Sequence, residues 1–264
     1  MIHSMRRAII KKDLRALITN KRQLIPLLAV PIVVAVVVPS VFILLAHFSP
    51  QEMMEMEKLA AFLPPGEQTD GTQQVMLWLL INNIMPAFFL LIPVMVASVS
   101  AASSFVGEKE KHTLETLLYC PLPLRGVFQS KILASFTLSM LVSLCSFAAM
   151  LLVAEAELLL TLGSPVFPGI NWLVTLLFVA PAISLFVITL IVRGSAKAQT
   201  ADESQQRTIF LILPVMAFII TQFSGMVFAS AWLLLGVGAA FALLAGICMR
   251  GVPQKISYET LLKR

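Results

Sequence analysis

The chain has 264 residues, of which 58% are hydrophobic and 12% are charged, and its mean hydropathy is +0.91. Soluble domains carry about 25% charged residues, so this composition excludes an ordinary soluble protein and predicts an all-α integral membrane protein. The net charge of +5 reflects basic residues beside membrane spans, and we expect membrane lipids but no nucleic acid among its partners.

Residues 1–22 are basic and predict a helix along the inner face of the membrane. Apolar residues recur at helical spacing between Ile10 and Ile18, while Lys11 and Arg15 fall on the other side. This pattern is typical of an interfacial amphipathic helix that leads into the first span. A basic tail that obeys the positive-inside rule without forming a helix is the alternative.

Runs of roughly 18 or more uncharged apolar residues predict membrane-spanning helices. The 42 uncharged residues from Thr208 to Met249 predict two spans, because at about 1.5 Å per residue they are far too long for one. We therefore expect a single transmembrane domain over residues 1–264. Its six predicted spans lie near residues 24–46, 75–106, 132–154, 172–192, 208–227 and 231–249.

The basic residues predict the orientation of the chain in the membrane. If both termini lie in the cytoplasm, all of the 19 basic residues except Lys58 fall on the cytoplasmic side, as the positive-inside rule requires. An even number of spans gives this arrangement, and six gives it without strain. We expect a multi-pass protein of the plasma or inner membrane with cytoplasmic termini.

The cores of the predicted spans hold no Asp, Glu, Lys, Arg or His. Ion-coupled carriers and proton pumps usually require such groups within the membrane, and intramembrane metalloenzymes require clustered His and carboxylate ligands. The only histidines, His3, His47 and His112, are scattered over both sides. We therefore expect no catalytic residue and no metal site, and the energy for any transport must come from elsewhere.

A charged segment lies between the second and third predicted spans, on the cytoplasmic side. Leu114, Leu117 and Leu118 recur at i, i+3 and i+4 and form one apolar face on a short helix. Thr113 can cap the first turn of this helix, and Pro121 ends it. Such a helix can place its leucines in a groove of a soluble partner. A solvated loop with one helical turn is the alternative.

The stretch EKEKHTLETLLYCP, residues 108–121, resembles the cytoplasmic signature of ATP-binding-cassette (ABC) exporter permeases of the type-2 group, which have the type V exporter fold. That signature reads approximately E-R-E-x-G-T-L-E, followed by a leucine pair and a proline. His112 stands where the family usually has glycine. Lys131 opens a K-I-L that resembles the start of the family's next span, and the basic N-terminal stretch resembles its connecting helix. The residues at matching positions are Glu108, Glu110, Thr113, Leu114, Glu115, Leu117, Leu118 and Pro121.

The resemblance implies the permease subunit of an ATP-driven exporter, with six spans per subunit and two subunits, identical or different, around the pathway. A separate ABC ATP-binding subunit would hold ATP and Mg²⁺, and a coupling helix near residues 111–119 would transmit its closure to the second and third spans. The chain itself has no G-x-x-x-x-G-K-[ST] phosphate loop, so we expect neither an enzyme nor a cofactor in it. The implied ATPase-coupling residues are Glu108, Glu110, His112, Thr113, Leu114, Glu115, Leu117, Leu118 and Pro121.

Four polar residues in the predicted spans are candidates for the substrate path: Asn82, Asn83, Gln222 and Ser224. In the family that the chain resembles, the second and fifth spans tend to line the dimer interface. A largely apolar path favours a hydrophobic, amphipathic or lipid-like cargo. Hydrogen bonding between helices is the alternative role for such side chains. A function from a different class, a non-transport membrane scaffold or assembly factor that docks another cytosolic protein, fits the same features.

Overall fold

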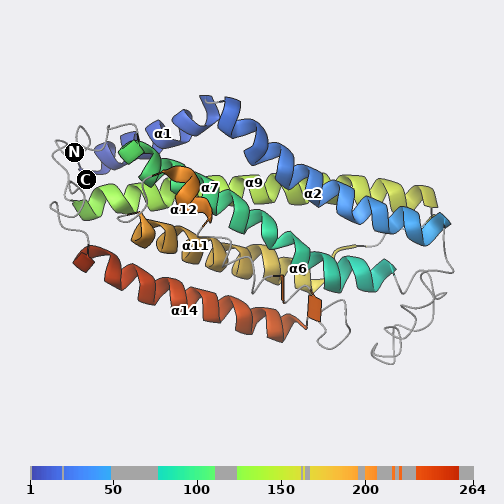
Figure 1. Cartoon of the computed structure of the whole chain (residues 1–264). Coiled ribbons are helices and arrows are strands. Elements are labelled where there is room, and N and C mark those ends of the chain that lie inside the picture. The colour runs from blue at the N-terminus through green and yellow to red at the C-terminus, as the bar shows by residue number, and fades with distance from the viewer. Residues whose placement is uncertain are drawn as a thin grey trace.

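The computed structural model describes residues 2–19, 21–48, 77–110, 124–161, 163, 167–195, 200–206, 216–217, 220–221 and 230–255. Within these residues the regular structure is helical, and no strand occurs (Figure 1). The helices are α1 (Ile2–Thr19), α2 (Lys21–Phe48), η2 (Leu80–Ile84), α6 (Met85–Phe89), α7 (Leu91–Glu110), α9 (Leu124–Thr161), α10 (Ile170–Val174), η3 (Thr175–Val179), α11 (Ala180–Gly194), α12 (Ala201–Gln206) and α14 (Ala231–Lys255).

Five helical stretches among the described residues are long and apolar enough to cross a membrane, so the chain is an all-α multi-pass membrane protein. The predicted fifth span, 208–227, lies almost entirely outside the described residues, and the predicted coupling helix near 111–119 lies wholly outside them. The six-span count therefore stays a prediction. The five stretches are Leu27–Leu45, Leu77–Glu108, Gly126–Thr161, Ile170–Gly194 and Ala231–Met249.

The long helices run side by side as one bundle, and α1 lies at the end where α7 ends and α9 begins (Figure 1). Helix α11 packs against α14, and α2 packs against α9. Helix α7 contacts both α9 and α11, and α1 rests on α9. The N-terminal helix is therefore part of the bundle, in contact with the elements on both sides of segment 111–123.

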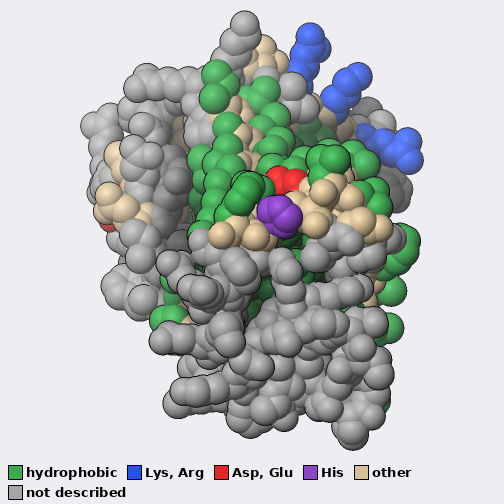
Figure 2. Space-filling view, turned by 90° about the vertical axis from the view of Figure 1, so that its right-hand side faces the viewer, with side chains coloured by type: hydrophobic (Ala, Val, Ile, Leu, Met, Phe, Trp, Pro, Cys, Tyr) green, Lys and Arg blue, Asp and Glu red, His purple; other side chains and the backbone are tan. Residues whose placement is uncertain are grey.

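The core of the bundle lies around α7. Ala97 and Ala101 of α7 are fully buried, and they share one hydrophobic cluster with Val187 and Ile191 of α11. Small side chains let membrane helices approach closely, which explains why α7 can contact two neighbours at once. Large hydrophobic side chains on the outer helices, such as Leu243, are exposed. Figure 2 shows hydrophobic side chains reaching the surface at one end of the bundle.

Helix α9 is longer than the predicted third span, 132–154. It has 38 residues and is about 57 Å long at 1.5 Å per residue, whereas the hydrocarbon core of a bilayer is about 30 Å thick. Lys131 and Glu157 lie within this helix, near its two ends. Lysine and glutamate are good helix formers, so these charges do not end the helix. Beyond Thr161, Gly163 adopts a φ of 68°, a conformation that favours glycine.

Two π-helical turns interrupt the spans, and each ends two residues before a proline. Helix η2 ends at Ile84, before Pro86, and η3 ends at Val179, before Pro181. Proline lacks an N–H and clashes with the carbonyl group of residue i−4. A π-turn widens the helix and relieves this clash. The freed carbonyl groups then require other donors, and the structure supplies one at η2.

Candidate functional site

The structure describes the two ends of the predicted ATPase-coupling segment. Of the predicted coupling residues, Glu108 is described with its side chain, and Glu110 is the last residue of α7. The others (His112, Thr113, Leu114, Glu115, Leu117, Leu118 and Pro121) lie outside the described residues. The geometry of the site therefore begins at Glu108, where the chain leaves α7, and at the start of α9, where it returns.

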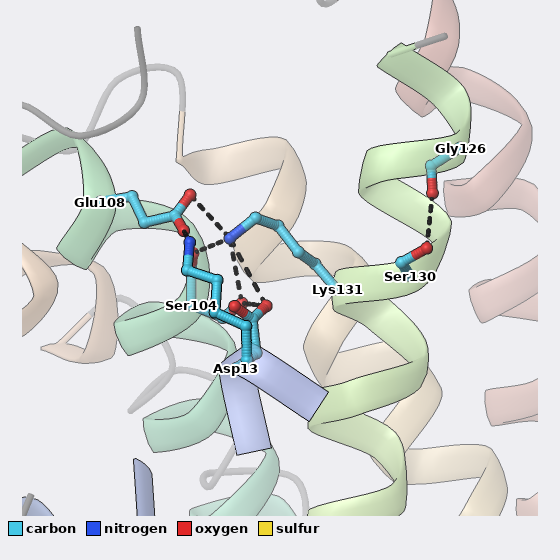
Figure 3. A network of polar contacts seen from close by, with 7 residues as sticks. Asp13, Ser104, Glu108, Gly126, Ser130 and Lys131 are labelled. Atoms are coloured by element: carbon cyan, nitrogen blue, oxygen red, sulfur yellow. Dashed lines mark hydrogen bonds and ion pairs between the residues drawn. The ribbon is translucent and has the colours of Figure 1, made fainter. Parts of the chain in front are cut away.

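Glu108 lies between two lysine side chains that come from different helices, and Figure 3 shows its contact with Lys131. Its Oε2 atom is 2.8 Å from Nζ of Lys131 in α9, and its Oε1 atom accepts a hydrogen bond of 2.7 Å from Nζ of Lys12 in α1. Glu108 itself is on the last turns of α7. One carboxylate thus links three helices that are distant in the sequence.

Asp13 of α1 adds a second carboxylate to this site. Its Oδ2 atom accepts a hydrogen bond of 2.9 Å from Oγ of Ser104 and is 3.6 Å from Nζ of Lys131. Lys131 also donates a hydrogen bond of 2.6 Å to the main-chain oxygen of Ser104. We call Lys12, Asp13, Ser104, Glu108 and Lys131 the charge cluster.

The charge cluster is electrically balanced, with two lysines and two carboxylates. Its members differ in burial: the side chain of Lys131 is 2% exposed and that of Asp13 is 6% exposed, whereas that of Lys12 is 56% exposed. Lys131 also lies 5.5 Å from the centre of the Phe105 ring, within the range of a cation–π contact. A buried ammonium group is tolerated only when charged or polar groups surround it closely, and Lys131 meets this condition.

The cluster raises the pKa of Lys12. Burial alone lowers this pKa, but the hydrogen bond and the negative charge of Glu108, with a contribution from Asp13, outweigh burial. The pKa of Lys12 therefore lies above the ordinary value for lysine. Lys12 is positively charged at neutral pH and contributes its charge to the cluster.

Sequence reasoning identified Glu108 and the family resemblance of Lys131, but it did not connect them with Asp13. Asp13 is the only acidic residue among residues 1–22. It lies one helical turn after Ile9, and both side chains are buried. An acidic residue on the apolar face of an otherwise basic helix was the available signal, because such a carboxylate requires a buried partner.

Asn82 and Asn83, two predicted path residues, lie in the π-helical turn η2 and contact the start of the span Ile170–Gly194. Oδ1 of Asn82 accepts a hydrogen bond of 2.5 Å from the N–H of Gly169. Nδ2 of Asn171 donates to the main-chain oxygen of Asn82 over 3.1 Å and to Oδ1 of Asn83 over 3.0 Å. Trp172 donates its indole N–H to the main-chain oxygen of Ile81 over 2.9 Å. We call the six residues joined by these bonds the asparagine cluster: Ile81, Asn82, Asn83, Gly169, Asn171 and Trp172.

The asparagine cluster has the hydrogen-bonding geometry of a contact between two spans. Asn82 is 1% exposed, and its Nδ2 atom has no hydrogen-bond partner within the described part of the chain. Gln222 and Ser224, the other two predicted path residues, lie outside the described residues. The role of these four residues in a substrate path stays a prediction.

The described residues contain no group of three or more His, Cys, Asp and Glu side chains that could hold a metal ion.

A family model described as "ABC-2 family transporter protein" matches residues 7–262 of the chain. Both the charge cluster and the asparagine cluster lie within the matched range. No curated protein and no solved structure matches the chain.

Proposed function

This chain belongs to the ABC-2 family of transporter proteins, and on that premise we propose that it is the permease subunit of an ATP-driven exporter. As an ABC-2 permease it is a membrane transport component, and the family implies association with an ABC ATP-binding subunit. In our proposal that partner holds ATP and Mg²⁺, and this chain hydrolyses no ATP itself. Two permease subunits, identical or different, form the path in the plasma or inner membrane, with their termini in the cytoplasm.

The observation that carries the proposal is the family match over residues 7–262, which is nearly the whole chain. The geometry of the charge cluster supports it with a physical route for coupling. Residues 111–123 depart from α7 and return through α9, and Glu108 and Lys131 hold those two helices together at the base of the segment. A force on the segment would therefore act on both spans at once.

The proposed cycle uses the segment as the contact with the ATP-binding subunit. Leu114, Leu117 and Leu118 would dock in a groove of that subunit. Closure of the ATP-binding subunits would then move α7 and α9 as rigid bodies and change access to the path between the permease subunits. The apolar spans favour a hydrophobic, amphipathic or lipid-like cargo over a hydrophilic ion.

Copurification tests the proposal. The chain, tagged in its native host and purified from there in mild detergent, is expected to carry an ATPase. Leu114→Asp and Leu118→Asp are expected to release that ATPase, because each places a charge in an apolar contact. Leu114→Met, which nearly conserves side-chain volume, is the matched control and is expected to retain it. A well-folded chain that binds no ATPase would contradict the proposal and favour the membrane scaffold.

A further inference from the structure

Lys131 is the most deeply buried ionic member of the charge cluster, and like Glu108 it contacts both other helices of the cluster. Its Nζ atom is 2.8 Å from Glu108 and hydrogen-bonded to Ser104 in α7, and it is 3.6 Å from Asp13 in α1. Its own helix, α9, begins only a few residues earlier, and Ser130 donates a hydrogen bond of 2.8 Å to the main-chain oxygen of Gly126 beside it (Figure 3). Lys131 thus joins α1, α7 and α9 at one point.

The contacts of Lys131 lie at the base of segment 111–123, where they can affect how a force on the segment reaches the helices. Glu108 precedes the segment and Lys131 follows it, so their ion pair closes the base of the loop that contains the segment. Asp13 adds α1 to the same base. Without the cluster, α7 and α9 would still be joined by their packing and by the hydrogen bond from Ser139 to the main-chain oxygen of Pro93. Helix α1 would be held only by its other contacts and by its covalent connection to α2.

We propose that Lys131 is a positioning residue of the transport cycle, which fastens α1 to the two helices that flank the segment, so that all three move as one unit. This inference rests on the proposed function for the force that moves the unit. The fastening itself is a property of this chain and is testable without nucleotide.

Lys12 provides a matched comparison for Lys131. Both lysines contact Glu108 at nearly the same distance, 2.7 Å and 2.8 Å, but the Lys12 side chain is 56% exposed and the Lys131 side chain 2%. An exposed ion pair contributes little because water screens it. Removal of the buried lysine leaves Asp13 and Glu108 as partly uncompensated buried charges, which is strongly unfavourable. The same substitution at the two positions should therefore have very different effects.

Hydrogen–deuterium exchange tests the fastening in the complex of permease and ATP-binding subunit, reconstituted in lipid nanodiscs. In Lys131→Met, we expect the amides of α1 to exchange at least about tenfold faster than in the wild type, because α1 detaches more often. Amides of α14, which carries no residue of the charge cluster, should keep their rates. Lys12→Met should leave the exchange of α1 near the wild-type rate. Wild-type exchange of α1 in Lys131→Met, or an equal increase in both variants, would overturn the inference.

The same exchange experiment with nucleotide distinguishes a positioning role of Lys131 in the transport cycle from a role in stabilising the fold alone. In the wild-type complex, trapping with ATP and vanadate is expected to change exchange in α1 and at the start of α9 together. In Lys131→Met, the start of α9 should still respond and α1 should not. A response of α1 that persists in Lys131→Met would overturn the positioning role.

Asp13→Asn keeps the inference testable if Lys131→Met does not assemble. This variant removes only the charge that α1 contributes, and it is also expected to speed the exchange of α1; unchanged exchange overturns the inference. If the wild-type preparation carries no ATPase and shows no nucleotide response, the proposed function fails. The comparison without nucleotide still decides whether Lys131 fastens α1.

Discussion

Trp172 donates its indole N–H to the main-chain oxygen of Ile81 over 2.9 Å, and this bond fastens the start of one span to the π-helical turn of another. Its origin lies in Pro86. In η2 the N–H of Met85 bonds to the oxygen of Leu80, five residues earlier. The next donor in that pattern would be Pro86, which has no N–H. The oxygen of Ile81 is left free, and Trp172 supplies the missing donor.

Replacing Trp172 by phenylalanine tests the value of this bond. Trp172 is 1% exposed and packs edge-on against Phe89, with ring centres 5.5 Å apart, so Trp172→Phe retains most of the ring contact. We expect the free energy of unfolding to fall by about 1–3 kcal/mol, because a buried oxygen loses its donor. Thermal unfolding in detergent measures this. Trp232→Phe is the control, since Trp232 is 83% exposed; an equal loss in both variants would contradict the interpretation.

Asn82→Leu separates the two roles considered for Asn82. The side chain is buried and accepts a hydrogen bond from the N–H of Gly169. If its main role is to join the two spans, the variant should lose about 1–3 kcal/mol of stability. Asn83→Leu should lose less, because Asn83 is only partly buried. Unfolding temperature and the yield of folded protein report both effects. If Asn82→Leu keeps wild-type stability but loses transport, the result would instead favour a role for Asn82 in the substrate path.

Two glycines of α14 give a matched test of helix packing. A Cβ atom at Gly238 would lie 2.5 Å from the Phe178 ring, whereas a Cβ atom at Gly236 would meet nothing within 4 Å. Alanine is the better helix former by up to about 1 kcal/mol. Gly236→Ala should therefore raise the unfolding temperature, and Gly238→Ala should lower it, with a net loss of about 1 kcal/mol from overpacking. Shifts of the same sign and size in both variants would show that α14 does not approach η3 this closely.

The ion pair between Lys12 and Glu108 should not weaken as the pH rises from 7 to 9. The pKa of Lys12 is raised in the folded chain. A raised lysine pKa gives a stabilisation that is fully present below the pKa of the unfolded chain and is lost only as the pH rises through the folded pKa. We expect the difference in unfolding temperature between the wild type and Lys12→Met to be small and constant across this range. A difference that shrinks between pH 7 and 9 would contradict the raised pKa.

The sequence predicts the class of the protein well, because membrane spans depend on local composition. The family resemblance of residues 108–121 is confirmed by the match over residues 7–262. Helix α9 extends beyond the predicted third span, 132–154, at both ends, because Lys131 and Glu157 are good helix formers and do not end it. The bounds of the span within the membrane stay a prediction. The sequence marks the end of the apolar environment, and this is a different property from the end of a helix.

The partners within the two polar clusters could not be predicted, because each contact joins residues that are far apart in the chain. Ser104 and Asp13 are 91 residues apart, as are Trp172 and Ile81. In the second pair the acceptor is a main-chain oxygen, which every residue possesses. No pattern of side chains points to it. Only the presence of Pro86 could have indicated that a carbonyl group nearby required a partner.

The π-turn at η2 has a consequence for any helical-wheel or labelling study of this span. One additional residue in a turn advances all later side chains by about 100° around the helix axis. A single helical wheel drawn from Leu77 to Glu108 would therefore place the residues on one side of the π-turn on the wrong face of the helix. When the accessibility of side chains to a label is measured along this span, the residues before and after the π-turn should be fitted with two separate helical periods. The phase should change between Leu80 and Ile84.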